Sequence, residues 1–281
     1  MRWMSFEHES SVSFGIVSEE AVIDVGKHYP QYRSLKALIA SGELDSTGAE
    51  AVSRAPDYAL SEIDFLPVIL HPDKILCAGL NYKAHMEETG NQDTTSPTLF
   101  TRFASSQVGH NRAMIKPRES DKLDYEGEIA LIIGKAGRRI PQETALSHVA
   151  GYSCYNDGSV RDFQGHTSQF TPGKNFIHTG GFGPWMMTPD EVGDLDAMEI
   201  TTRLNGEVMQ NSRSTYLIFG FAELISYCST FTELVAGDVI VTGTPAGVGA
   251  ARKPQVFMMP GDKIEIEVTP IGTLCNTIIE G

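Results

Sequence analysis

The stretch Asp124-Tyr125-Glu126-Gly127-Glu128-Ile129-Ala130-Leu131-Ile132-Ile133 is the most informative part of the chain. It alternates at first and then becomes continuously apolar, which is typical of a strand that enters a protein core. Side chains two positions apart leave the same face of a strand, so Glu126 and Glu128 start about 7 Å apart at the backbone. Two carboxylates this close repel each other unless a cation lies between them. The stretch predicts a core strand that begins with two cation-binding carboxylates.

A second polar cluster, Asn156-Asp157-Gly158-Ser159, follows the apolar and aromatic segment 149–155. An aspartate at a strand end can supply a third carboxylate, although Asn-Asp-Gly is also a common turn composition. An exposed Glu-x-Glu on an amphipathic strand is likewise the simpler explanation of the glutamate pair when it is taken alone. Three carboxylates without a His or Cys ligand pair would favour a hard ion, magnesium or manganese.

Composition limits the classes of function. The chain has 281 residues, with 22 basic against 36 acidic side chains and a formal charge of −14. This excess of acid argues against nucleic acid and against an anionic membrane surface as partners. The four cysteines are far apart and predict reduced thiols rather than disulfides or a zinc site: Cys77, Cys154, Cys228 and Cys275. With no signal-like or membrane-spanning apolar run, we expect a soluble, cytoplasmic protein.

The pattern along the chain predicts an α+β, strand-rich protein with a small N-terminal α/β domain, residues 1–70, and a main domain, residues 71–281. The expected N-terminal elements are a hairpin of 12–17 with 21–24, helices at 34–40 and 49–55, and a strand at 63–66. The expected later strands are 75–78, 126–133, 199–204, 238–241 and 263–268. Asn205-Gly206 predicts a type I′ hairpin turn, and Thr188-Pro189-Asp190-Glu191 predicts a capping box at a helix start. A buried helix is expected over 217–228.

From Phe100 onward these residues resemble the fumarylacetoacetate hydrolase family. The motifs that carry the resemblance occur in the family's order and include the segments 124–128, 151–152, 156–164, 173–176, 183–185, 205–207, 242–248 and 260–262. Upstream, Cys77-Ala78-Gly79-Leu80-Asn81-Tyr82 with His85-Met86-Glu87-Glu88 is similar to the family's lid segment. Each motif is weak alone, but the series in register, over roughly residues 74–278, is specific.

The resemblance implies a mixed β-roll catalytic domain, commonly in a homodimer, and it implies roles for particular residues. The metal ligands would be Glu126, Glu128 and Asp157, for Mg²⁺ or alternatively Mn²⁺. His85 and Glu88 would form the acid–base pair, with Lys174 as a further catalytic group. The substrate contacts would be Tyr82, Arg102, Arg161, Gln164 and Thr244.

Several of these residues also have simpler explanations. His85 alone is typical of a surface histidine, Lys174 of a solvated Pro-Gly-Lys turn, and Tyr82 of a core residue. Arg102, which stands where many relatives have Lys-Pro, could contact a distal substrate carboxylate or form a surface ion pair. The glycines around Thr244 could be turn residues or could direct backbone N–H groups at a substrate carboxylate.

The main functional hypothesis is hydrolytic C–C cleavage of an acylpyruvate or related 2,4-dioxo acid, in which Glu88 and His85 activate water and a metal-stabilised enolate leaves. The alternative is an oxaloacetate-type decarboxylase or a keto–enol isomerase of a hydroxymuconate-like dioic acid, because both need the same enolate. A more distant alternative is a non-catalytic binding or structural protein on the same fold. In each enzymatic case the partner is a small anionic 2-oxo acid.

Overall fold

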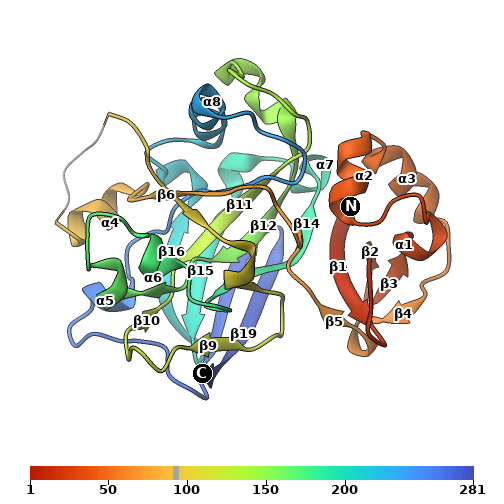
Figure 1. Cartoon of the computed structure of the whole chain (residues 1–281). Coiled ribbons are helices and arrows are strands. Elements are labelled where there is room, and N and C mark those ends of the chain that lie inside the picture. The colour runs from red at the N-terminus through yellow and green to blue at the C-terminus, as the bar shows by residue number, and fades with distance from the viewer. Residues whose placement is uncertain (91–94) are drawn as a thin grey trace.

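The computed structural model describes residues 1–90 and 95–281, and a long sheet runs through it from the N-terminal segment into the main body (Figure 1). Its strands follow the order β4-β3-β2-β1-β14-β12-β11-β17-β6-β7, with β5 on β1 and β8 on β14. The strand bounds are β1 Arg2–His8, β2 Ser11–Ser18, β3 Ala21–Asp24, β4 Tyr58–Ala59, β5 Asp64–Phe65, β6 Ile75–Gly79, β7 Thr98–Arg102, β8 Gln107–Val108, β11 Gly127–Ile133, β12 Val149–Asn156, β14 Gly180–Met187 and β17 Val239–Val241.

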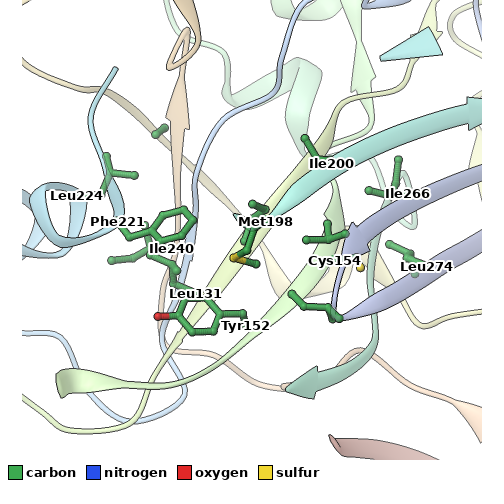
Figure 2. Close-up of a cluster of buried hydrophobic side chains, with 14 of the residues drawn as sticks. Leu131, Tyr152, Cys154, Met198, Ile200, Phe221, Leu224, Ile240, Ile266 and Leu274 are labelled. Atoms are coloured by element: carbon green, nitrogen blue, oxygen red, sulfur yellow. The ribbon is translucent and has the colours of Figure 1, made fainter. Parts of the chain in front are cut away.

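A second sheet, in the order β16-β15-β18-β19-β9, packs across β11, β12 and β14. Its strands are β9 Met114–Lys116, β15 Glu199–Leu204, β16 Glu207–Arg213, β18 Lys263–Thr269 and β19 Gly272–Glu280, and β10 Leu123–Asp124 pairs separately with β13 Ser159–Val160. Figure 2 shows the core between these layers, in which Leu131, Tyr152 and Cys154 meet Ile200 and Ile266. Each large apolar side chain buried there contributes about 1.5–3 kcal/mol. This packing holds the start of β11 in place between the two sheets.

The N-terminal segment forms a unit at one side of the molecule, red to orange in Figure 1. It contains helices α1 Val25–His28, α2 Leu35–Ser41 and α3 Leu44–Ala51. Strand β1 pairs with β14 through Arg2↔Met187 and Trp3↔Met186, so the sheet is shared by both parts. A division into two domains at residue 70 stays a prediction.

The remaining helices are short apart from one. Their bounds are α4 Lys83–Glu88, α5 Arg161–Gln164, α6 Thr171–Lys174, α7 Pro189–Val192 and α8 Phe221–Phe231. Within the described residues, no helix is long and apolar enough to cross a membrane.

Most predicted elements are present, and two of the differences come from contacts between distant segments. The hairpin turn is confirmed, because Asn205 and Gly206 have φ of 53° and 83°. The helix expected over 217–228 begins only at Phe221, since Asn81 binds the backbone of Ile218 and Phe219. The helix expected over 49–55 instead spans Leu44–Ala51, so it begins and ends earlier than predicted.

The helix predicted at residue 188 starts as expected with Pro189 at its first turn. The capping box is wrong, because the Thr188 side chain makes no cap hydrogen bond. Its hydroxyl oxygen accepts a hydrogen bond from the Met1 ammonium at 2.5 Å instead. A tertiary contact therefore replaces the local cap.

Candidate active site

The three predicted carboxylates come together where β11 begins and β12 ends. The strands are antiparallel with Gly127 opposite Asn156, and this register sets Glu126 and Glu128 beside Asp157, the residue after β12. The backbone N–H of Asp157 donates to the Glu126 carbonyl at 2.8 Å. Ligand oxygens of all three side chains lie within 4.8 Å of one another. Distant segments of the sequence thus form one acidic centre.

Glycines allow this close approach of chains. A Cβ on Gly127 would lie 2.1 Å from the Thr202 hydroxyl, and one on Gly158 would lie 1.9 Å from the Thr179 carbonyl oxygen. A larger residue at Gly158 would push against the Thr179 backbone, and one at Gly127 would displace the side chain of Thr202. The Gly residues next to the acidic ones are thus required by packing.

The buried triad is suited to a divalent metal. Glu126, Glu128 and Asp157 are 4%, 1% and 0% exposed, which contradicts the alternative of an exposed strand face for the glutamate pair. Burial, and then the charges of Asp157 and Glu126, raise the pKa of Glu128 well above its ordinary value. A cation between the oxygens would reverse that repulsion, and an all-oxygen donor set suits a hard ion.

Three cationic side chains contact the triad, and Lys174 and Arg161 are two of them. Lys174 is 1% exposed, and its ammonium lies 2.6 Å from both Glu126 Oε2 and Asp157 Oδ2. Arg161 Nη1 lies 2.6 Å from Glu126 Oε1. Burial opposes ionisation of Glu126, but Lys174 and Arg161 outweigh it and lower the pKa of Glu126. Lys174 is therefore no solvated turn residue.

Arg161 is held in place yet keeps free donor capacity. Its Nε donates to Asp124 at 2.8 Å and its Nη1 to Gln164 Oε1 at 2.9 Å. Its buried Nη2 has no hydrogen-bond partner within the described part of the chain. Because an unpaired buried donor is costly, this group is well suited to an anionic ligand.

Arg102 lies elsewhere than predicted. Its side chain is fully buried behind the triad, with Nη1 2.5 Å from Asp157 Oδ1 and 2.9 Å from the Gly158 carbonyl oxygen. It is neither a surface ion pair nor placed to contact substrate. Its position suits orientation of the Asp157 carboxylate.

His85 and Glu88 form a hydrogen-bonded pair on helix α4. His85 Nδ1 lies 2.8 Å from Glu88 Oε1, and His85 is 5% exposed, unlike an ordinary surface histidine. Glu88 also accepts from the Gly247 N–H at 3.1 Å through both oxygens. The Gly243 N–H donates to Glu128 at 2.6 Å. These two N–H groups therefore bind carboxylates of the protein, not a substrate carboxylate.

The acidic centre and the His85–Glu88 pair open into one cavity of about 460 Å³. Of the predicted residues, the cavity is lined by His85, Glu88, Glu126, Glu128, Arg161, Gln164, Lys174 and Thr244. Tyr82 is 2% exposed and lines a separate cavity of about 560 Å³ beside Leu217 and Pro245. The structure thus brings most of the predicted site together but sets Tyr82 and Arg102 outside it.

One wall of the cavity is apolar. It includes Leu80, Phe100, Phe170 and Val248. The rings of Phe100 and Phe170 meet edge to face with centroids 5.7 Å apart, and Lys174 Nζ lies 4.8 Å from the Phe100 centroid. No role was predicted from the sequence for these side chains.

The family comparison fits this geometry. The model for the C-terminal domain of fumarylacetoacetate (FAA) hydrolase matches residues 74–279. The chain belongs to the fumarylacetoacetate hydrolase family. Its strand-rich α+β fold is that of a family member.

Related proteins fall into both expected reaction classes. The chain is 36% identical over 288 residues to the mitochondrial oxaloacetate tautomerase FAHD2A of Bos taurus, covering 99% of this chain and 92% of that protein. It is similar to the fumarylacetoacetate hydrolase of Exiguobacterium antarcticum, with 33% identity, a TM-score of 0.84 and full coverage of both chains. Maleylpyruvate hydrolase of Sphingobium, solved with manganese(II) and pyruvate, has 25% identity, a TM-score of 0.83 and full coverage of both chains.

Proposed function

We propose that this family member interconverts the keto and enol forms of a small 2-oxo dicarboxylic acid of the oxaloacetate type. The observation that carries the proposal is the shared cavity, in which the His85–Glu88 pair faces the carboxylate triad and Lys174. The similarity to oxaloacetate tautomerases over nearly the whole chain supports this reaction ahead of hydrolysis.

Glu126, Glu128 and Asp157 would hold Mg²⁺, or alternatively Mn²⁺. When bound there, such an ion supplies a Lewis acid that polarises a 2-oxo group. Two cations of the protein would stabilise the negative charges of the substrate. Arg161 Nη2 would bind a substrate carboxylate, and the Lys174 ammonium would lie near the oxygen that gains negative charge.

The proton would move through His85. Its Nδ1 faces Glu88, which leaves Nε2 to take a proton from the carbon next to the 2-oxo group. The Glu88 carboxylate stabilises the imidazolium that forms. The His85 imidazolium then returns that proton to the oxygen, so the C–H bond is broken, an O–H bond is formed, and neither substrate nor protein gains or loses a proton overall.

Hydrolysis of an acylpyruvate is the second candidate. The same base pair could deprotonate water, whose oxygen would add to the distal carbonyl before the C–C bond breaks and the pyruvate enolate is protonated. The 460 Å³ cavity and its apolar wall favour this candidate, because they accommodate a substrate larger than oxaloacetate. Decarboxylation of oxaloacetate would pass through the same enolate.

The test compares three reactions in Mg²⁺- or Mn²⁺-loaded protein: loss of the oxaloacetate enol absorbance, release of CO₂ from oxaloacetate, and release of pyruvate from acylpyruvates. We expect wild type to accelerate enol loss, and His85→Asn to abolish it. Glu88→Gln should nearly abolish pyruvate release from an acylpyruvate but only reduce decarboxylation. If wild type accelerates none of the three, the enzymatic proposal fails. If pyruvate release alone is fast, hydrolysis replaces tautomerisation.

We also propose that the chain forms a homodimer in the cytoplasm. Family resemblance is the support for the dimer, and light scattering of the purified protein tests it. A monomer mass at micromolar concentration would contradict the dimer. Localisation of a tagged chain tests the compartment.

A further inference from the structure

The orientation of the base pair depends on one backbone group outside helix α4. The Gly247 N–H donates to Glu88 Oε1 and Oε2, each at 3.1 Å, while Glu88 Oε1 also lies 2.8 Å from His85 Nδ1. Any shift of residue 247 therefore moves the Glu88 carboxylate. Because the carboxylate orients the imidazole, such a shift also turns His85.

Gly247 is itself held by two side chains. Its carbonyl oxygen accepts from the Tyr125 hydroxyl at 3.1 Å and from Arg252 Nε at 3.1 Å. Arg252 Nε also lies 3.1 Å from the Tyr125 hydroxyl, and its Nη2 donates to the Met209 carbonyl at 2.6 Å. Arg252 thereby links the backbone at Gly247 to strand β16.

The contact between Gly247 and strand β16 leaves no space for a side chain at position 247. Gly247 has a φ of +105°, and a Cβ there would lie 2.2 Å from the Met209 carbonyl oxygen. The close approach and the positive φ both require glycine. Gly247 thus packs closely against the Met209 carbonyl, which also accepts the hydrogen bond from Arg252.

We propose that Tyr125 and Arg252 are positioning residues that act through Gly247 to hold Glu88, and hence His85, in its reactive orientation. Neither side chain lines the described cavity, and Tyr125 is fully buried. The hydrogen bonds connect both side chains to the base pair through the Gly247–Glu88 contact. The predicted effect on kcat rests on the proposed function. The role of Tyr125 and Arg252 in holding Gly247 in place does not.

Kinetics of single variants test the proposal first. A displaced base loses on the order of 10- to 100-fold in rate, so Arg252→Met should lower kcat by about that factor with KM within about twofold. Arg252→Lys, which keeps a donor, should recover part of the loss. Tyr125→Phe removes one hydrogen bond and should cost a few-fold. The matched control is Arg203→Met, which removes a partly exposed ion pair with Glu267 on the adjacent strand β18; neither residue lines the cavity, and kcat should be unchanged.

A double-mutant cycle separates positioning from a general structural role. In a Glu88→Ala background, Arg252→Met should cause no further loss of kcat, because the contact through which it acts is gone. Equal losses in both backgrounds would overturn the proposal. Should Arg252→Met fail to fold, Tyr125→Phe lacks a single oxygen atom and carries the same cycle.

Hydrogen exchange gives a readout that needs no substrate. Peptides containing Gly247 and residues 83–88 should exchange faster in Arg252→Met than in wild type, and no faster in Arg203→Met. Unchanged exchange at both segments would refute the proposal that Arg252 holds Gly247 in place. If wild type turns over no 2-oxo acid, the proposed function fails, while the exchange result still decides whether Arg252 braces Gly247.

Discussion

Replacing Arg102 by methionine tests whether this buried cation supports the acidic centre. Arg102 and Asp157 are both fully buried, with 2.5 Å between Nη1 and Oδ1. Arg102 also donates to the Gly158 carbonyl and to the Ser106 and Thr179 hydroxyls. The substitution keeps an unbranched stem of similar length but leaves the aspartate with Lys174 as its cationic partner.

Breaking a buried ion pair by removing one partner costs about 3–5 kcal/mol of the free energy of unfolding. At roughly 2.1 cal/mol/K of unfolding entropy per residue, a chain of 281 residues should then lose about 5–8 °C in Tm. Urea unfolding and calorimetry measure both quantities. Arg203→Met, which breaks a pair whose side chains are 33% and 40% exposed, should cost less than about 1 kcal/mol.

A double variant decides whether the loss comes from the charge of Asp157, which in Arg102→Met has lost one of its two cationic partners. If it does, Arg102→Met combined with Asp157→Asn should lose less stability than the sum of the two single variants, by about 1–3 kcal/mol. Strict additivity, or a loss for Arg102→Met no larger than for Arg203→Met, would refute the assigned role of Arg102.

Three further outcomes are expected. Lys174→Met should lower kcat by about 10²–10³-fold while divalent-ion affinity, measured by calorimetry, persists; unchanged kcat would contradict its role beside the developing charge. Phe170→Ala should raise KM roughly tenfold or more for a 2-oxo acid with an apolar tail, and less for oxaloacetate; equal effects on both would place the tail elsewhere. Burial opposes ionisation of Asp57, but hydrogen bonds from Lys27, the Asp24 N–H and His28 outweigh it and lower its pKa. The stability from Asp57 is therefore present above an ordinary aspartate pKa of about 3.9 and lost as the pH falls through the lower folded value, so the Tm deficit of Asp57→Asn should be full at pH 7 and shrink below pH 4.

Local sequence was sufficient for features with short-range causes. The change from alternating to continuous apolar residues after Glu128 predicted β11, and Asn205-Gly206 predicted the hairpin turn. Spacing along one strand put Glu126 and Glu128 on the same side. Family motifs in order added Asp157, which lies in the same acidic cluster.

Other features depended on which distant segments meet. The register of β11 with β12 set Asp157 beside the glutamates, and the fold buried Arg102 behind it instead of at the cavity. The same packing turned the Gly243 and Gly247 N–H groups toward Glu128 and Glu88. Residue type and spacing determine what a side chain can donate or accept, and so determined the carboxylate-rich chemistry of this protein. Only the tertiary structure decided which partner each group has, because partners in separate segments of the chain leave no periodic signal in the sequence.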